Sequence, residues 1–149
     1  MTYRERLHVP WWWAVIALLF WLSLAVAVVA YVPLQPAVAF SVLAAVGLLL
    51  ALVAYSRTLV AVDHDALIAG RHRLTREYIA GVVPLSGSSA RAAYGPEADH
   101  RAFLFTRPFI TDLVRVDLAD PADPHPYWLV STRHPEELAA ALEAVRGNP

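Results

Sequence analysis

Acidic residues beside a histidine are the first feature of this chain that could do chemistry. Asp120, Asp123 and His125 lie close together, and carboxylate and imidazole groups are ligands for divalent metals. Three prolines interrupt the same stretch, and an aspartate before a proline commonly caps its own turn. We favour the turn interpretation, and we expect neither a metal nor a cofactor.

Clustered arginines offer a second chemistry, the binding of anions. All 12 basic residues of the chain are arginine. Arg57, Arg71, Arg73 and Arg76 form the densest group, and each cation close to an anionic membrane surface contributes about 1 kcal/mol of binding. The residues from Arg57 onward nevertheless hold more acidic than basic side chains. A solvated sheet edge is therefore the alternative that we favour over lipid contact.

Catalytic patterns are missing from the sequence. His72, His100 and His134 have no partner at a catalytic spacing, and neither a nucleophile elbow nor a glycine-rich phosphate loop occurs. Cysteine is absent, which excludes disulfides and thiolate metal sites. A net charge of −1 gives no field that would attract nucleic acid. We expect a protein that binds without catalysing a reaction, and no nucleic-acid partner.

The elements that position these residues begin with an apolar stretch. Hydrophobic residues make up 58% of the chain and charged residues 17%, whereas soluble domains average roughly 45–50% and about 25%. No residue from Val9 to Ser56 carries a formal charge. Two prolines divide this stretch into 11–31 and 37–55, each long enough as a helix to cross the roughly 30 Å core of a bilayer. We predict two transmembrane helices in a lipid bilayer, joined by an extracytoplasmic turn over 32–36.

The arginines that flank this hairpin predict its orientation. Arg4 and Arg6 precede the first helix, Arg57 follows the second, and the turn has no cation. The positive-inside rule places residues 1–10 and the domain 57–149 in the cytoplasm, as parts of a multi-pass protein of the cell membrane. A cleaved signal peptide is the competing interpretation of the first segment. The length and the tryptophans of that segment argue against cleavage.

Residues 57–149 alternate short apolar runs with turn residues, which is typical of β-structure. His64 and Asp65 predict the turn of a hairpin. Alternation is strict from Val114 to Leu118 and predicts one buried and one exposed face. We expect a loop from Ser86 to about His100. The runs predicted to be strands are 59–63, 66–70, 79–85, 102–105, 114–118 and 127–131.

The C-terminal segment predicts an amphipathic helix. Pro135 suits a first helical turn, and Glu136 and Glu137 complement the positive end of the helix dipole. A meander of strands closed by such a helix is the plan of pleckstrin-homology-like domains. The expected fold is a membrane α-helical hairpin plus an α+β domain, a pleckstrin-homology-like meander or barrel capped by the helix. Its apolar stripe is predicted to consist of Leu138, Ala141, Leu142 and Val145.

Several segments together resemble a known family. Tyr3-Arg4-Glu5-Arg6-Leu7 precedes a tryptophan-rich helix, Ala69-Gly70-Arg71 follows the predicted hairpin, and residues 120–124 form an aspartate- and proline-bearing run. Residues 126–133, with the sequence PYWLVSTR, are the most specific part. These segments are similar to the actinobacterial membrane proteins grouped as the domain of unknown function 3093. The resemblance covers nearly the whole chain and implies a two-helix anchor and an actinobacterial source, but no activity.

The segment from Asp120 to Arg133 is the best candidate for specific binding. Its prolines preorganise the chain, and Tyr, Trp and Arg dominate interface hot spots. The alternative is a structural corner in which Arg133 pairs with Glu136 or Glu137. Alternation predicts that one of the two aromatic residues on the last strand faces the core and the other faces outward. The candidate partner-binding residues are Asp120, Asp123, His125, Tyr127, Trp128 and Arg133.

Two functions remain open. The first is a membrane-tethered scaffold or binding module that docks a protein partner, for instance in an envelope complex. The second is a sensor of anionic lipid or of a small ligand at the inner membrane face. A concave pocket ringed by arginines would favour the sensor, whereas a flat apolar or edge-strand surface would favour docking. We expect the first of these functions.

Overall fold

The computed structural model describes residues 3–56 and 58–147. Their contacts divide them into two compact units. One unit is the helical segment from His8 to Thr58, and the other combines the residues up to Leu7 with those from Leu59 onward. The second unit is therefore discontinuous in sequence, because the helical segment is inserted after its first strand.

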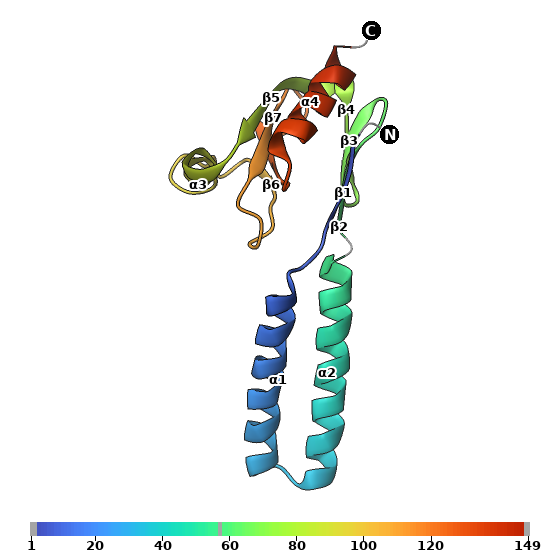
Figure 1. Cartoon of the computed structure of the whole chain (residues 1–149), viewed down its shortest axis with the longest axis vertical. Coiled ribbons are helices and arrows are strands. Elements are labelled where there is room, and N and C mark those ends of the chain that lie inside the picture. The colour runs from blue at the N-terminus through green and yellow to red at the C-terminus, as the bar shows by residue number, and fades with distance from the viewer. Residues whose placement is uncertain (1–2, 57, 148–149) are drawn as a thin grey trace. The chain divides into compact units, whose positions relative to one another are not determined.

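The helical unit is a hairpin of two long apolar helices, α1 (Trp11–Tyr31) and α2 (Leu34–Ser56), which lie side by side (Figure 1). Both are long and apolar enough to cross a membrane, and almost no residue in either helix is buried. Trp21 Nε1 donates a hydrogen bond to the carbonyl oxygen of Ser41 at 2.9 Å, and Ala37 is fully buried. One face of each helix thus packs on the other, and the remaining faces form an apolar surface.

The turn of the hairpin is shorter than the predicted 32–36. We expected the second helix over 37–55, but it begins at Leu34 and ends at Ser56. Proline is tolerated in a first helical turn because no intrahelical bond needs its missing amide there, so Pro36 continues the helix. The amide of Ala37 donates to the carbonyl oxygen of Pro33 at 3.1 Å and closes this turn.

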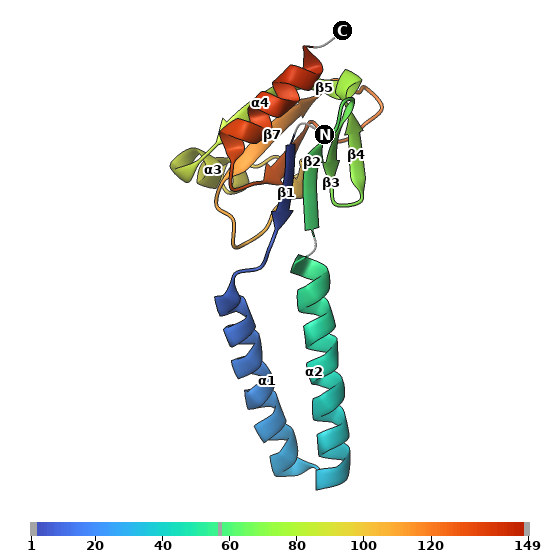
Figure 2. The same ribbon diagram turned by 45° about the vertical axis from the view of Figure 1, so that its right-hand side comes forward.

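The first sheet has the strand order β1-β2-β3-β4. It contains β1 (Tyr3–Leu7), β2 (Thr58–Val62), β3 (Ala66–Ala69) and β4 (His72–Thr75). Figure 2 shows β1 beside β2, although the whole helical hairpin separates them in sequence. The sequence predicted β2 and β3 but neither β1 nor β4. Residues 3–7, expected to be part of a cytoplasmic terminus, belong to the sheet domain.

The second sheet has the order β5-β7-β8-β6. Its antiparallel strands are β5 (Ile79–Leu85), β7 (Leu113–Leu118) and β8 (Tyr127–Ser131), and β6 (Phe103–Phe105) pairs in parallel with β8. Every predicted strand is present, with ends shifted by a residue at most. The parallel β6 departs from the predicted meander. The two sheets are open, so the expected barrel is not shown.

A short helix, α3 (Gly87–Tyr94), occupies part of the segment predicted to be a loop. Serines and a glycine lower its helical propensity, which made the sequence look irregular. The hydroxyl of Ser89 accepts a hydrogen bond from the amide of Ser86 at 3.2 Å and donates one to its carbonyl at 2.8 Å, which fixes the start of the helix. Ala90 is the buried residue of α3.

The core of the sheet domain lies between the two sheets and the C-terminal helix α4 (Pro135–Arg146). Leu138, Leu142 and Val145 of α4 belong to one apolar cluster with residues of both sheets, and Ala141 packs against it, as the predicted stripe requires. A single turn of 3-10 helix (Arg76–Tyr78) links β4 to β5. The predicted sheet-rich domain with a C-terminal helix is confirmed.

We predict that Leu142→Asp unfolds the sheet domain, because it places a charge at a fully buried position of α4. The matched control is Ala140→Asp, which introduces the same side chain on the exposed face of the same helix. Thermal unfolding of the detergent-solubilised chain, followed by near-ultraviolet circular dichroism, should show loss of the transition only for Leu142→Asp. Equal effects of the two substitutions would contradict the packing of α4.

Candidate functional site

Three of the four arginines expected to face lipid are described by the structure, and they are spread along β4. Arg57 lies outside the described residues. Arg71 is exposed in the turn between β3 and β4, and Arg76 begins the 3-10 helix at the other end of β4. Arg73 donates to both carboxylate oxygens of Asp65 at 2.9 Å. Among the described members of the group, one is thus held in an ion pair and two lie at opposite ends of a strand.

The aspartates of the 120–126 segment close their own turns. Asp120 Oδ1 accepts the amide of Ala122 at 2.8 Å. Asp123 Oδ1 accepts the amide of His125 at 2.9 Å and lies 2.6 Å from His125 Nδ1. The amide of His125 is the main cause that lowers the pKa of Asp123, and its imidazole adds to the effect. Within residues 3–56 and 58–147, no group of three metal-ligating side chains is assembled.

Tyr127 and Trp128, of which one was expected to face the core and the other to face outward, are both buried. Trp128 belongs to the core between the sheets. Tyr127 points to the other face of β8, where the Cζ atom of Arg115 lies 4.1 Å from its ring centroid. Its hydroxyl accepts the amide of Asp99 at 2.8 Å. The expectation of an outward aromatic is wrong because the second face of the sheet is covered as well, so neither side chain is available to a partner.

An aromatic cluster surrounds Trp128. The ring centroid of Phe103 lies 4.5 Å from that of Trp128, 4.9 Å from that of His72 and 5.6 Å from that of His125. These side chains come from β8, β6, β4 and the 120–126 segment, and so from both sheets. The indole Nε1 of Trp128 is buried without a hydrogen-bond partner in the described part of the chain. The cluster packs the two sheets together, which assigns His125 to a structural contact.

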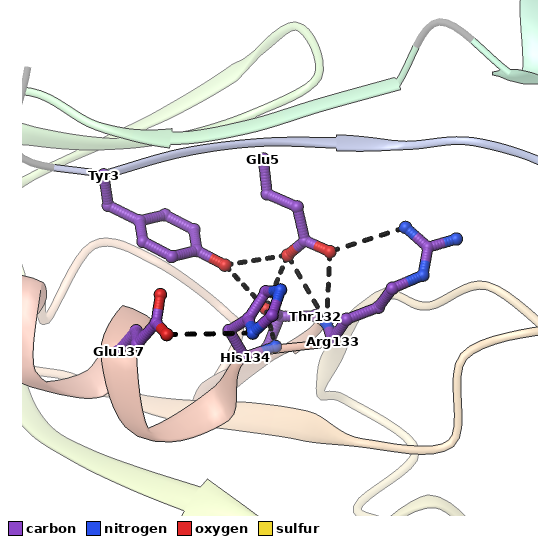
Figure 3. Close-up of polar contacts among 6 residues, drawn as sticks. All are labelled: Tyr3, Glu5, Thr132, Arg133, His134 and Glu137. Atoms are coloured by element: carbon purple, nitrogen blue, oxygen red, sulfur yellow. Dashed lines mark hydrogen bonds and ion pairs between the residues drawn. The ribbon is translucent and has the colours of Figure 1, made fainter.

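Arg133 is paired with a residue from the far end of the sequence. Its guanidinium lies 3.6 Å from Glu5 Oε1, and its backbone amide donates to the same oxygen at 3.2 Å (Figure 3). We expected Glu136 or Glu137 as the partner. Glu137 instead lies 3.8 Å from His134 Nδ1. The alternative of a structural corner therefore holds for Arg133, but with a different carboxylate.

Glu5 is the centre of a buried polar network that links β1 to the junction of β8 and α4. Its side chain is only 10% exposed. Glu5 Oε2 accepts hydrogen bonds from Tyr3 Oη at 2.8 Å and from Thr132 Oγ1 at 2.6 Å (Figure 3). Thr132 Oγ1 also accepts the amide of His134 at 3.1 Å. Burial is the main cause that raises the pKa of Tyr3, so this phenol remains a hydrogen-bond donor across the physiological range.

The alternation of residues 3–7 carried a signal for this network. Tyr3, Glu5 and Leu7 face inward while Arg4 and Arg6 are exposed, which is the period of a half-buried strand. The two arginines were instead assigned to membrane orientation. The partner of Glu5 could not be deduced, because Thr132 and Arg133 lie more than a hundred residues away.

A pocket that sequence reasoning did not find lies beneath α3. It has a volume of about 170 Å³ and is enclosed by α3 and by the segment that precedes β7. Ala90, Pro108, Ile110 and Leu113 form its apolar wall. Its polar lining consists of Arg91, Tyr94, Thr106, Arg107 and Thr111.

Fold and sites together define a class of protein: a helical hairpin with the length and composition of membrane spans, inserted into a sheet-rich α+β domain. The chain belongs to the family described as protein of unknown function (DUF3093), whose model matches residues 2–142. No curated protein and no solved structure matches the chain. The family assignment therefore carries no activity and no site residue.

We predict that Glu5→Gln destabilises the sheet domain by about 1–3 kcal/mol, because the amide keeps the shape of the side chain but loses its charge-assisted bonds. Arg6→Gln, which removes an exposed charge from the same strand, should change stability by less than about 0.5 kcal/mol. Chemical denaturation of the full chain in detergent measures both values. A difference within error would show that the network contributes nothing.

Asp99 forms an ion pair with Arg101, and the contribution of this pair to stability depends on pH. The guanidinium of Arg101, 3.1 Å away, and its backbone amide lower the pKa of Asp99 to about 2 from the ordinary 3.8. The pair therefore favours the folded state above pH 3.8, and its contribution is lost as the pH falls towards 2.

Arg101→Gln should raise the pKa of Asp99 part of the way to 3.8, since the backbone bond remains. Arg71→Gln should leave this pKa unchanged. Carboxyl carbon chemical shifts recorded by NMR against pH provide the measurement. An unchanged pKa in Arg101→Gln would show that the ion pair is not formed in solution.

Proposed function

We propose that this chain is a membrane-anchored module that binds a partner without catalysing a reaction. In this proposal α1 and α2 span the cell membrane as a multi-pass anchor, and both termini and the sheet domain lie in the cytoplasm. The arginines that precede α1 and follow α2 support this orientation, because the Val32–Pro33 connection has no charge. The apolar surface left on the hairpin supports contact with lipid.

One observation carries the proposal: the sheet domain is joined to the hairpin through two neighbouring strands. β1 leads into α1 after three residues, and one residue separates α2 from β2, yet β1 and β2 are adjacent in one sheet. The network around Glu5 ties β1 to the last strand and to α4. A sheet domain that is connected to the helical hairpin through two strands and closed by its own hydrogen bonds suits a membrane-anchored binding module.

The ion pairs and hydrogen bonds of several carboxylates in the sheet domain support binding over catalysis. Asp65, Asp99, Asp117 and Asp123 each pair with an arginine or histidine close in sequence. Glu5 has several donors in its network. These carboxylates hold the fold together, and we therefore propose that the module is not an enzyme.

Finer features of the proposal come from the resemblance noted in the sequence. We propose a pleckstrin-homology-like domain, supported by two packed sheets and a C-terminal helix in the core. The parallel strand β6 is the departure from that plan. An actinobacterial source follows from the resemblance alone.

Two kinds of partner are compatible with such a module: a protein in an envelope complex, and an anionic lipid or small ligand. The arginine-lined pocket beneath α3 is the concave feature that favours a ligand. Of the expected partner-binding residues, Tyr127 and Trp128 are buried and Arg133 is engaged by Glu5, so the 120–133 segment offers a poor protein-docking surface. We therefore favour the ligand-binding form of the module.

The orientation can be tested by single cysteines, because the chain has none of its own. Val32→Cys, in the connection between the helices, should react with a membrane-impermeant maleimide in intact cells. Ala140→Cys, on the exposed face of α4, should react only after the cells are permeabilised. Labelling of Ala140→Cys in intact cells would overturn the proposed orientation, and labelling of neither variant in intact cells would overturn the extracytoplasmic turn.

A further inference from the structure

The lining of the pocket beneath α3 contains cationic side chains and no acidic ones. Arg91 and Arg107 line it, and no aspartate or glutamate is among the residues that do so. Elsewhere in the domain, Arg73, Arg101 and Arg115 each lie within 3.1 Å of an aspartate oxygen. The side chain of Arg91 forms no such pair with any residue in the described ranges. Its guanidinium is thus available to a ligand.

A second hollow has acidic side chains beside its arginine. It lies on the outer face of β5 and β7, and its lining includes Arg115, Asp117 and Glu97. Arg115 Nε donates to Asp117 Oδ1 at 2.7 Å, so this cation already has its counter-charge. In the pocket beneath α3, by contrast, Arg91 has no acidic partner among the described residues, so an added anion would supply one for this side chain.

The walls of the pocket are held in place by the rest of the domain. The amide of Arg107 donates to the buried hydroxyl of Ser131 at 2.9 Å. Asp112 accepts the amide of Thr132 on its carbonyl at 3.2 Å and the amide of Gly87 on its carboxylate at 3.4 Å. One wall, the segment that contains Arg107 and Asp112, is therefore bonded to Ser131 and Thr132 at the end of β8. The other wall, α3, is bonded to Asp112 through Gly87. Because both walls are already held in place, little conformational entropy is lost when a ligand enters.

The position of Arg107 is fixed from two sides. Its Cζ atom lies 5.2 Å from the ring centroid of Phe105, and its Nη1 donates to the carbonyl of Thr106 at 3.3 Å. This guanidinium is half-buried, whereas that of Arg91 is exposed at the rim. A half-buried cation against an apolar wall strengthens the attraction for an anion, because the local dielectric is lower than in water.

We propose that this pocket binds a small organic carboxylate with a compact apolar body, an inference that rests on the proposed function and names what the module binds. A guanidinium recognises a planar carboxylate through two parallel hydrogen bonds. The hydroxyls of Thr106 and Thr111 are further donors along the lining. The wall of Ala90, Ile110 and Leu113 covers the apolar body, which a bare inorganic anion would leave without a contact.

The volume sets the size of the ligand. The pocket has about 170 Å³, and an apolar cavity of about 150 Å³ in another protein holds one benzene molecule. A single aromatic ring or a short branched chain therefore fits, with its carboxylate towards the arginines. A whole lipid chain is larger than this volume. Benzoate is the simplest probe that combines these features.

The test measures binding of benzoate to the full chain in detergent by ligand-observed NMR and calorimetry. We expect a dissociation constant of roughly 1 mM or tighter for the wild type. Arg91→Gln should weaken binding about tenfold, because it removes the unpaired guanidinium. The affinity of Arg91→Lys for benzoate should lie between those of the wild type and of Arg91→Gln, since lysine keeps the charge but lacks the planar guanidinium. Arg71→Gln, which removes an exposed arginine outside the pocket, is the matched control and should bind like the wild type.

Three further probes test whether the pocket prefers a neutral ligand, an inorganic anion or an anionic lipid to a carboxylate. Benzamide has the same ring without a charge and should bind at least tenfold more weakly than benzoate. Inorganic phosphate should not compete with benzoate, and vesicles containing anionic lipid should not displace it. Equal binding of benzoate and benzamide, tighter binding of phosphate, displacement by vesicles, or insensitivity to Arg91→Gln would each overturn the proposal.

Failure of this inference is separable from failure of the proposed function. Cysteine labelling tests the membrane anchor without any ligand. A chain that passes the labelling test but ignores benzoate would remain a membrane-anchored module with a different partner. A chain that binds benzoate through Arg91 but fails the labelling test would have a carboxylate site on a differently placed domain.

Discussion

A buried carboxylate on the first strand is the interaction on which the sheet domain depends. Glu5 brings together a phenol, a hydroxyl and a backbone amide that come from opposite ends of the chain. An isolated charge at 10% exposure would be costly, and here these donors and the guanidinium of Arg133 compensate it. The network fixes where β8 ends and α4 begins, and α4 in turn supplies Leu138 and Leu142 to the core between the sheets.

Other carboxylates of the sheet domain are also compensated by partners within the protein. The two carboxylates that the sequence offered as metal ligands, Asp120 and Asp123, accept backbone amides two residues further along the chain. Such local pairs stiffen loops at little cost, because the residues that form them are already close in the unfolded chain. The pocket beneath α3 differs, since its two arginines come from separate segments and its lining has no acid. Among the described residues, Arg91 is the member of this pair whose side chain has no acidic partner, and the ligand proposal is based on it.

Local patterns predicted the elements whose signals are strong. The uncharged stretch from Val9 to Ser56 predicted the helical hairpin, and runs of apolar residues predicted β5, β7 and β8. Weak signals were missed: β4 is short and carries polar residues on its exposed side, and α3 is rich in serine. Long-range facts were not accessible from one sequence. Alternation places Tyr127 on the opposite face of β8 from Trp128, but only the fold shows that Arg115 and residues near Asp99 cover that face.

The insertion of the hairpin after β1 has a consequence for how the chain is made. The ribosome releases β1 before the two apolar helices, and its neighbour β2 emerges only after both of them. Thr132 and Arg133, which complete the bonds of Glu5, are synthesised later still. The strand β1 therefore cannot form these bonds, and its carboxylate stays hydrated, until Thr132 and Arg133 have been synthesised. Closure of the sheet domain is thus a late event, and it reports that the hairpin has already been synthesised in full.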